Sequence, residues 1–178
     1  MPRLLARSAP RPASEHAGDR LVALLRLIDS SIWIPVLRRT HPAAPPLRTR
    51  IAELQGDGTA ATTEPVLFEV LRGARDDTNY QRLEAELRAL PCLTMTSERW
   101  QEAAELAYRL RRQHGMTFPT NDLLIASVAM AHRATLVDRD SDFDLIARHA
   151  PLKVESHVRP AGDTGSETDS LAVTLPRG

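Results

Sequence analysis

Short apolar runs typical of buried strands alternate along this chain with longer segments typical of helices. The runs are "VALLRLID" (22–29), "TAATT" (59–63), "CLTMT" (92–96), "ATLVD" (134–138) and "LKVE" (152–155). The intervening segments with helical patterns span 30–39, 47–54, 63–73, 79–90, 97–115, 120–133 and 142–150. Strands separated by helices form βαβ units, whose strands lie parallel in one sheet. The sequence therefore predicts the α/β class with a central parallel sheet.

The chain has 178 residues, enough for one domain with a tail at each end. We expect the folded domain to span residues 26–156. Residues 1–25 are rich in proline and small or polar residues and are predicted to form a flexible arm. Residues 157–178 contain mostly Gly, Ser, Thr, Pro and acidic residues, and are predicted to form a flexible tail.

The composition excludes several classes of protein. Cys92 is the only cysteine, so a disulfide within the chain is impossible, and we expect its thiol to be buried in a strand. The six histidines show no zinc-binding spacing. No run of 18 apolar residues is present, and the N-terminal pattern does not indicate a signal peptide. A cytoplasmic protein without a membrane segment is predicted, with Trp33 and Trp100 packed in its core.

Four acidic residues lie beside apolar segments where an isolated carboxylate is costly to bury. Asp29 and Asp140 follow strand-like runs, whereas Glu69 and Asp122 lie on apolar helices. The ligand sites of parallel sheets lie at the carboxyl ends of the strands, so these acids are expected to converge there. Converging carboxylates repel one another unless a cation neutralises them, and a hard divalent ion prefers oxygen ligands.

Two of these acids also have simpler explanations. Asp122 lies in the first turn of its helix, where a negative charge interacts favourably with the helix dipole. Glu69 is three residues before Arg72, so an ion pair on the helix surface is the alternative. Neither alternative accounts for all four acids together.

Four segments in order resemble the PIN-domain nucleases, and in particular the VapC-type toxins of toxin–antitoxin pairs. The segments are "LIDSSIWI", "FEVLRGA", "TNDLLIASVAMAHRATLV" and "DRDSDF", and the resemblance covers about residues 26–155. It implies a three-layer α/β/α PIN-like domain with a central parallel sheet. It also implies a metal-dependent endoribonuclease, in which bound Mg²⁺ or Mn²⁺ supports attack of water on RNA and leaves a 5′-phosphate.

By position, the resemblance assigns the catalytic and metal-binding roles to four residues and adds one less constant acid. The four are Asp29, Glu69, Asp122 and Asp140, and the fifth acid is Asp142. Their carboxylates supply the oxygen ligands expected for a hard divalent ion.

Supporting roles are expected at four further positions. The Ser31 hydroxyl is expected to orient the first acid of the cluster. Asp138 departs from the family pattern, which often has Thr or Ser there, and an acid at this position either joins the metal shell or disturbs it. Arg72 and Arg139 are candidates for contact with RNA phosphates.

The resemblance further implies a cognate antitoxin and a homodimer. A groove between the helix near Trp33–Leu37 and the helix at Leu47–Leu54 is the expected antitoxin surface. Two non-enzymatic alternatives remain. A degenerate PIN module would bind RNA or a protein without cleavage, which the retention of all four acids disfavours. A phosphoacceptor receiver domain would need an Asp after its third strand, where this chain has "CLTMTSE".

Overall fold

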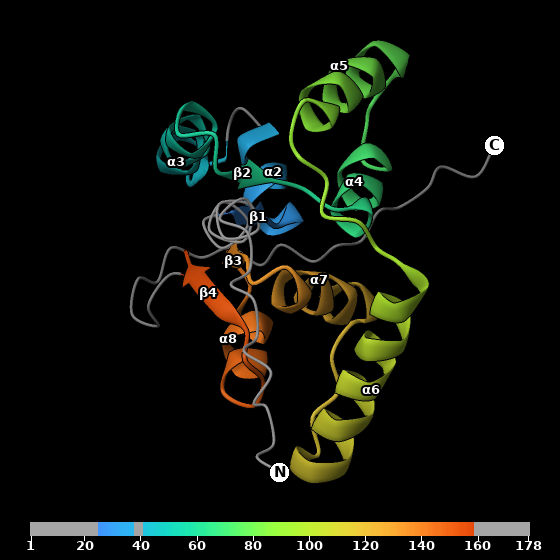
Figure 1. Cartoon of the computed structure of the whole chain (residues 1–178). Helices are drawn as coiled ribbons and strands as arrows, with labels where there is room; N and C mark the ends of the chain where they lie inside the picture. Colours follow the sequence, from blue (N-terminus) through green and yellow to red (C-terminus); the bar gives the residue numbers. More distant parts are fainter. Residues whose placement is uncertain (1–24, 38–40, 159–178) are drawn as a thin grey trace, which may run out of the picture.

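The computed structural model describes residues 25–37 and 41–158. Within these ranges, four parallel strands form one sheet in the order β2-β1-β3-β4 (Figure 1). The strands are β1 (Arg26–Ile28), β2 (Ala60–Ala61), β3 (Thr135–Asp138) and β4 (Lys153–Ser156). The predicted parallel sheet is confirmed.

Seven helices belong to the described part of the chain. They are α2 (Ser30–Leu37), α3 (Ala44–Gly56), α4 (Glu64–Leu71), α5 (Asp77–Arg88), α6 (Ser97–His114), α7 (Thr120–Ala131) and α8 (Ser141–Ala147). Local sequence explains several of their ends. The side chains of Asp76 and Thr96 accept hydrogen bonds from backbone N–H groups in the first turns of α5 and α6. Gly115 ends α6 with a φ of 67°, a conformation that glycine adopts without strain.

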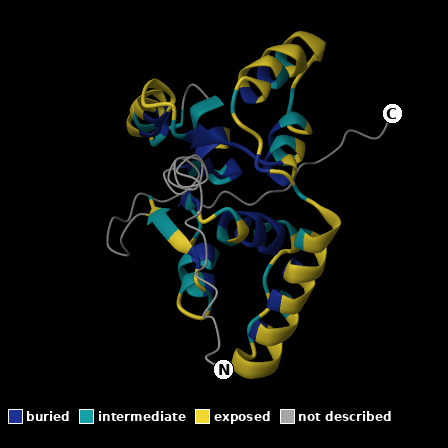
Figure 2. Cartoon of the chain, viewed as in Figure 1, coloured by how far each residue is buried: buried dark blue, intermediate teal, exposed yellow. Residues whose placement is uncertain are grey.

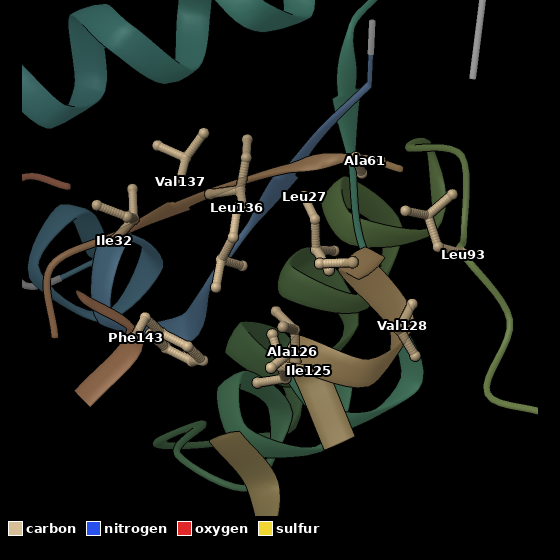
Figure 3. Packing of buried hydrophobic residues seen from close by; sticks show 14 of the residues in the cluster. Leu27, Ile32, Ala61, Leu93, Ile125, Ala126, Val128, Leu136, Val137 and Phe143 are labelled. Atoms are coloured by element: carbon tan, nitrogen blue, oxygen red, sulfur yellow. The ribbon is translucent and has the colours of Figure 1, made fainter. Parts of the chain in front are cut away.

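Helix α7 lies against the middle of the molecule. Its residues from Leu123 to Ala129 are all buried, as expected for a helix enclosed on every side. Figure 3 shows Ile125 and Ala126 on the side of the sheet toward which Leu27 points, whereas α3 lies on the opposite side. Figure 2 shows the contrast between buried α7 and the largely exposed outer surface of α6. The sheet with helices on both sides matches the expected α/β/α layers.

The strand predicted at residues 92–96 is not formed over that length. Residues 92–96 contribute only an isolated bridge between Cys92 and Thr62, beside the short strand β2. Neighbouring side chains of an extended segment point in opposite directions, so Leu93 is buried at 5% exposure, whereas the Cys92 side chain is exposed and the expected buried thiol is not found. The prediction for Trp33 is confirmed at 5% exposure, whereas Trp100 is 54% exposed and lies outside the core.

Most of the two predicted tails, and the start of the first predicted strand, lie outside the described residues. Within the described ranges, no helix is long and apolar enough to cross a membrane.

Candidate metal centre

The topology of the sheet brings acidic residues to the carboxyl ends of β1 and β3, and this edge of the sheet is called the crevice below. From β1 the chain moves outward to β2 on one side, and it later returns to build β3 and β4 on the other side. The strand order therefore changes direction between β1 and β3, which is where ligand sites of open parallel sheets form. Asp29 directly follows β1, and Asp138 is the last residue of β3.

Asp29 is the most enclosed acid of the predicted four, with 3% of its surface exposed. Its Oδ2 accepts a hydrogen bond of 2.8 Å from the backbone N–H of Ser31. Burial raises the pKa of Asp29 from 3.8 to about 6, and the negative charge of Glu69 adds to this rise. Hydrogen bonds from the Ser31 hydroxyl and from the backbone of Ser30 and Ser31 partly oppose it. The expected contact between Ser31 and Asp29 is therefore present.

Glu69 enters the crevice from α4. The Ser30 hydroxyl donates a hydrogen bond of 2.6 Å to Glu69 Oε2, linking the start of α2 to α4. No ion pair of Glu69 with Arg72 is formed, so the surface ion pair considered for Glu69 is absent. Instead, the guanidinium carbon of Arg72 lies 5.9 Å from the centre of the Phe68 ring. Sequence reasoning did not single out Ser30, although the "DSS" pattern places a second hydroxyl beside the first acid.

The pKa of Asp122 is raised by burial and by the charges of all the other predicted metal-binding acids. Its pKa is raised from 3.8 to about 7, first by partial burial and then by the negative charges of Asp140, Asp29, Asp142 and Glu69, in that order. A helix dipole favours the ionised form and so cannot account for a raised pKa. The electrostatic coupling places the acids around one site, although they come from four separate segments.

Asp140 and Asp142 lie at the start of α8. Asp140 is the N-cap residue, and its Oδ1 accepts a hydrogen bond of 2.9 Å from the backbone N–H of Asp142. Partial burial and the charge of Asp140 raise the pKa of Asp142. The last acidic motif is thus held in place by the helix that it begins.

Asp138 is fully buried beneath this cluster. Its Oδ1 accepts a hydrogen bond of 3.1 Å from the Asp140 backbone N–H, whereas its buried Oδ2 has no hydrogen-bond partner. Burial raises the pKa of Asp138 to about 8, and the charges of Asp144, Asp29 and Asp140 contribute. Burial thus disfavours a negative charge on Asp138 in the protein without a metal ion.

A hydrogen bond also joins the ends of the two central strands. The backbone N–H of Arg139 donates to the Ser31 hydroxyl oxygen over 2.9 Å. Ser31 thus holds the segment after β1 against the segment after β3, in addition to its contact with Asp29. The predicted supporting residue therefore belongs to the crevice, and Arg139 is placed there through its backbone.

The donors in the crevice fit a hard divalent cation. They are carboxylate oxygens with neighbouring serine hydroxyls, the ligand type that Mg²⁺ and Mn²⁺ prefer. Burial and the charges of the neighbouring acids raise the pKa of Asp122, and a bound cation would neutralise the negative charge that these acids share. Among residues 25–37 and 41–158, no three His, Cys, Asp or Glu side chains already form a metal site.

The sheet order and the acidic crevice define a PIN domain. The family model described as the PIN domain matches residues 26–149, and the chain belongs to this family. Its relatives include Ribonuclease VapC11 of Mycobacterium tuberculosis (strain ATCC 25618 / H37Rv), which is 39% identical over 133 residues. That match covers 73% of this chain and 97% of the relative. Ribonuclease VapC51 of the same strain is 34% identical over 128 residues, covering 71% of this chain and 88% of VapC51.

A solved structure supports the same assignment. The crystal structure of VapBC2 from Rickettsia felis, bound to a DNA fragment from its promoter, matches with a TM-score of 0.62 and 26% identity. The match covers 74% of this chain and 98% of that chain. FitAB bound to a DNA fragment shares the fold, with a TM-score of 0.61 at 17% identity. The family resemblance inferred from the four motifs is therefore confirmed.

Proposed function

We propose that this protein is a metal-dependent endoribonuclease and the toxin of a toxin–antitoxin pair. The observation that carries the proposal is the set of acids around Asp122, whose pKa is raised to about 7 by burial first and then by the charges of these acids. A cluster of this kind is unfavourable in a fold without a cationic ligand. The ribonuclease relatives at 39% identity support RNA as the substrate.

Some residues of the crevice would bind the metal ion, and others would orient these metal-binding side chains. Asp29, Glu69, Asp122 and Asp140 would hold Mg²⁺ or Mn²⁺, with Asp142 beside them. When bound, the ion supplies Lewis acidity and positive charge against the scissile phosphate. The Ser30 and Ser31 hydroxyls orient Glu69 and Asp29 through the hydrogen bonds described above. Exposed Arg72 and partly exposed Arg139 are proposed to contact RNA phosphates.

Cleavage of RNA by the purified protein tests this function. Activity is expected with Mg²⁺ or Mn²⁺ and is expected to stop in EDTA. Asp29→Asn and Asp122→Asn should each lower the rate at least about 100-fold, the size of effect seen when an electrostatic contact to the transition state is lost. Asp57→Asn is the matched control, because Asp57 is exposed at the end of α3.

Undiminished cleavage by both site variants would mean that the activity arises elsewhere or comes from a contaminant. Specific RNA binding without cleavage would instead favour the degenerate module that binds without catalysis.

The antitoxin is proposed to dock between α2, α3 and α5. A groove of about 630 Å³ is lined there by Trp33, Val36, Leu37, Arg48, Arg82 and Glu86. The expected groove between α2 and α3 thus gains a third wall from α5. Among the residues that the structure describes, the buried Trp33 Nε1–H has no hydrogen-bond partner, so an antitoxin acceptor would satisfy it. The VapBC2 complex among the structural relatives supports a partner of this kind.

Charge reversal tests this docking surface. Arg82→Glu should weaken binding of the cognate antitoxin, because Arg82 lines the groove and its pair with Glu86 spans one helical turn. Arg88→Glu is the control, because it breaks a similar pair with Glu84 on α5 but does not line the groove. Equal effects of the two substitutions on the dissociation constant would place the antitoxin elsewhere.

In the cell, expression of the chain alone should slow growth, and co-expression of the antitoxin should restore it. Normal growth during expression of the folded protein without antitoxin would contradict the toxin assignment.

We also propose a cytoplasmic location and a homodimer, and the exposed Phe68 and Trp100 offer apolar surface for association. Sedimentation of the purified protein tests the dimer.

A further inference from the structure

A second hollow lies between α6 and the start of α7, the helix that also carries Asp122 of the metal centre. It has a volume of about 310 Å³. Residues from α6, from the connection to α7 and from α7 itself line it: Ala107, Tyr108, Arg111, Met116, Thr117, Phe118 and Leu123. None of these side chains has a role in the metal centre.

The connection between α6 and α7 shapes the hollow. Gly115 ends α6 in the left-handed conformation, and the Met116 N–H donates to the Leu110 carbonyl over 3.3 Å. The chain then passes without helix or strand as far as Pro119. Leu123 follows Asp122 directly, and one helical residue advances the backbone by only about 1.5 Å. The hollow therefore begins at the residue that follows Asp122 in the chain.

The lining suits a flat aromatic group attached to a negative charge. Tyr108 is a large aromatic residue with 60% of its surface exposed. Arg111 is also exposed and has no ion-pair partner within the described part of the chain, whereas Arg99 and Arg109 on the same helix pair with glutamates. An aromatic platform next to a free guanidinium is a common arrangement for binding single-stranded nucleic acid.

We propose that this hollow binds one nucleobase of the RNA substrate, next to the scissile phosphate. The base stacks on Tyr108 against the apolar wall, and Arg111 contacts the adjoining phosphate. This inference rests on the proposed ribonuclease function. The volume lies at the lower end of the range for small-ligand pockets, which suits a single base better than the broad surface that a protein partner covers.

Substitutions in the hollow, combined with changes in the RNA, test this inference. The substrate is an RNA oligonucleotide with a mapped cut, together with copies that lack one base at each of the two positions on either side. Tyr108→Ala should lower kcat/KM on the complete RNA by about 5- to 150-fold, the equivalent of the ~1–3 kcal/mol of one base–aromatic stack. The loss should fall mainly on KM. Tyr108→Phe, which keeps the ring, should restore cleavage.

The decisive result is coupling between protein and RNA. On the one copy that lacks the bound base, Tyr108→Ala should have almost no further effect, because the stacking partner is already gone. Arg111→Ala should raise KM on every copy, whereas Arg112→Ala, outside the hollow, should change it little. Tyr80→Ala on α5 is the control for loss of an exposed aromatic residue.

The same loss from Tyr108→Ala on all copies would overturn the base pocket. Normal cleavage combined with weaker antitoxin binding or dimer dissociation would overturn it as well, and would identify the hollow as a protein contact. Failure of the unchanged protein to cut any RNA with Mg²⁺ or Mn²⁺ would reject the proposed function, and this inference with it. Cleavage by the unchanged protein that Tyr108→Ala leaves intact would reject the base pocket alone.

Discussion

Replacement of Asp29 by Asn should stabilise the metal-free protein while abolishing its activity. Asp29 is 3% exposed, and burial together with the charge of Glu69 disfavours its ionised form. Asn removes the charge and keeps an oxygen that can accept the 2.8 Å hydrogen bond from the Ser31 backbone. Asp29 is thus expected to be needed for activity while lowering the stability of the metal-free fold.

The magnitude and its pH dependence follow from the pKa. A rise from 3.8 to about 6 in the folded protein disfavours folding with an ionised Asp29 by about 3 kcal/mol above pH 6, at ~1.4 kcal/mol for each pH unit. The cost declines as the pH falls toward 3.8, where the carboxyl is protonated in the folded and unfolded states alike. Because the amide is still a buried polar group, the net gain at pH 8 is about 1–2 kcal/mol.

Thermal denaturation in EDTA measures this effect. A gain of about 1–2 kcal/mol raises Tm by roughly 3–6 °C for a chain of this size. At pH 5 the ionisation cost is about half that at pH 8, whereas the cost of the buried amide does not change, so the Tm difference should fall to about a third of its pH 8 value or less. Added Mg²⁺ should then raise the Tm of the unchanged protein more than that of the variant, because binding to the folded state is stabilising.

Asp57→Asn should leave Tm unchanged under all these conditions. A lower Tm for Asp29→Asn at pH 8 would refute the reasoning, because it would mean that the ionised carboxylate stabilises the fold. An equal Tm difference at pH 8 and pH 5 would refute it as well, because the effect would then not come from charge.

Three further predictions concern stability. Phe143→Ala should cost about 3–5 kcal/mol in the free energy of unfolding by urea, because its side chain is 1% exposed in the core; a loss below about 1 kcal/mol would contradict this packing. Arg50→Gln should cost at most about 1 kcal/mol at neutral pH, because its pair with Glu155 is partly exposed. Since Arg50 lowers the pKa of Glu155, that cost should vanish as the pH falls and the carboxyl is protonated, and a cost that persists in acid would have another origin. Deletion of residues 1–18 and 163–178 should change Tm by less than about 5 °C, because neither segment has the apolar periodicity needed to pack; a larger drop would show that a tail docks on the domain.

Local patterns predicted the sheet and the positions of the acids because both depend on short-range sequence. Asp29 and Asp140 follow apolar runs, and parallel strands bring such positions to one edge. The hydrogen bond between Ser30 and Glu69 was not predictable in this way, because it joins residues 39 positions apart. No local signal reports a contact between two helices at that separation.

The errors at Trp100 and Cys92 have a related cause. Trp100 precedes Ala103 by three residues, on the stripe of α6 that continues through Leu106 and Leu110, and this periodicity predicts burial. The pattern specifies a face of the helix but not how far the neighbouring elements cover it, so Trp100 is left in solvent. Cys92 lies in an apolar run, yet it pairs at only one residue beside the short strand β2.

The acids of the crevice are supplied by β1, α4, α7 and the start of α8, in that order along the chain. The last of the four, Asp140, is also the residue that begins α8 and ties itself to the end of β3. A nascent chain that has not yet emerged from the ribosome beyond this point lacks Asp140 and β3, one of the two strands that pair with β1. The four acids can therefore gather at one edge of the sheet only after about four fifths of the chain has been synthesised.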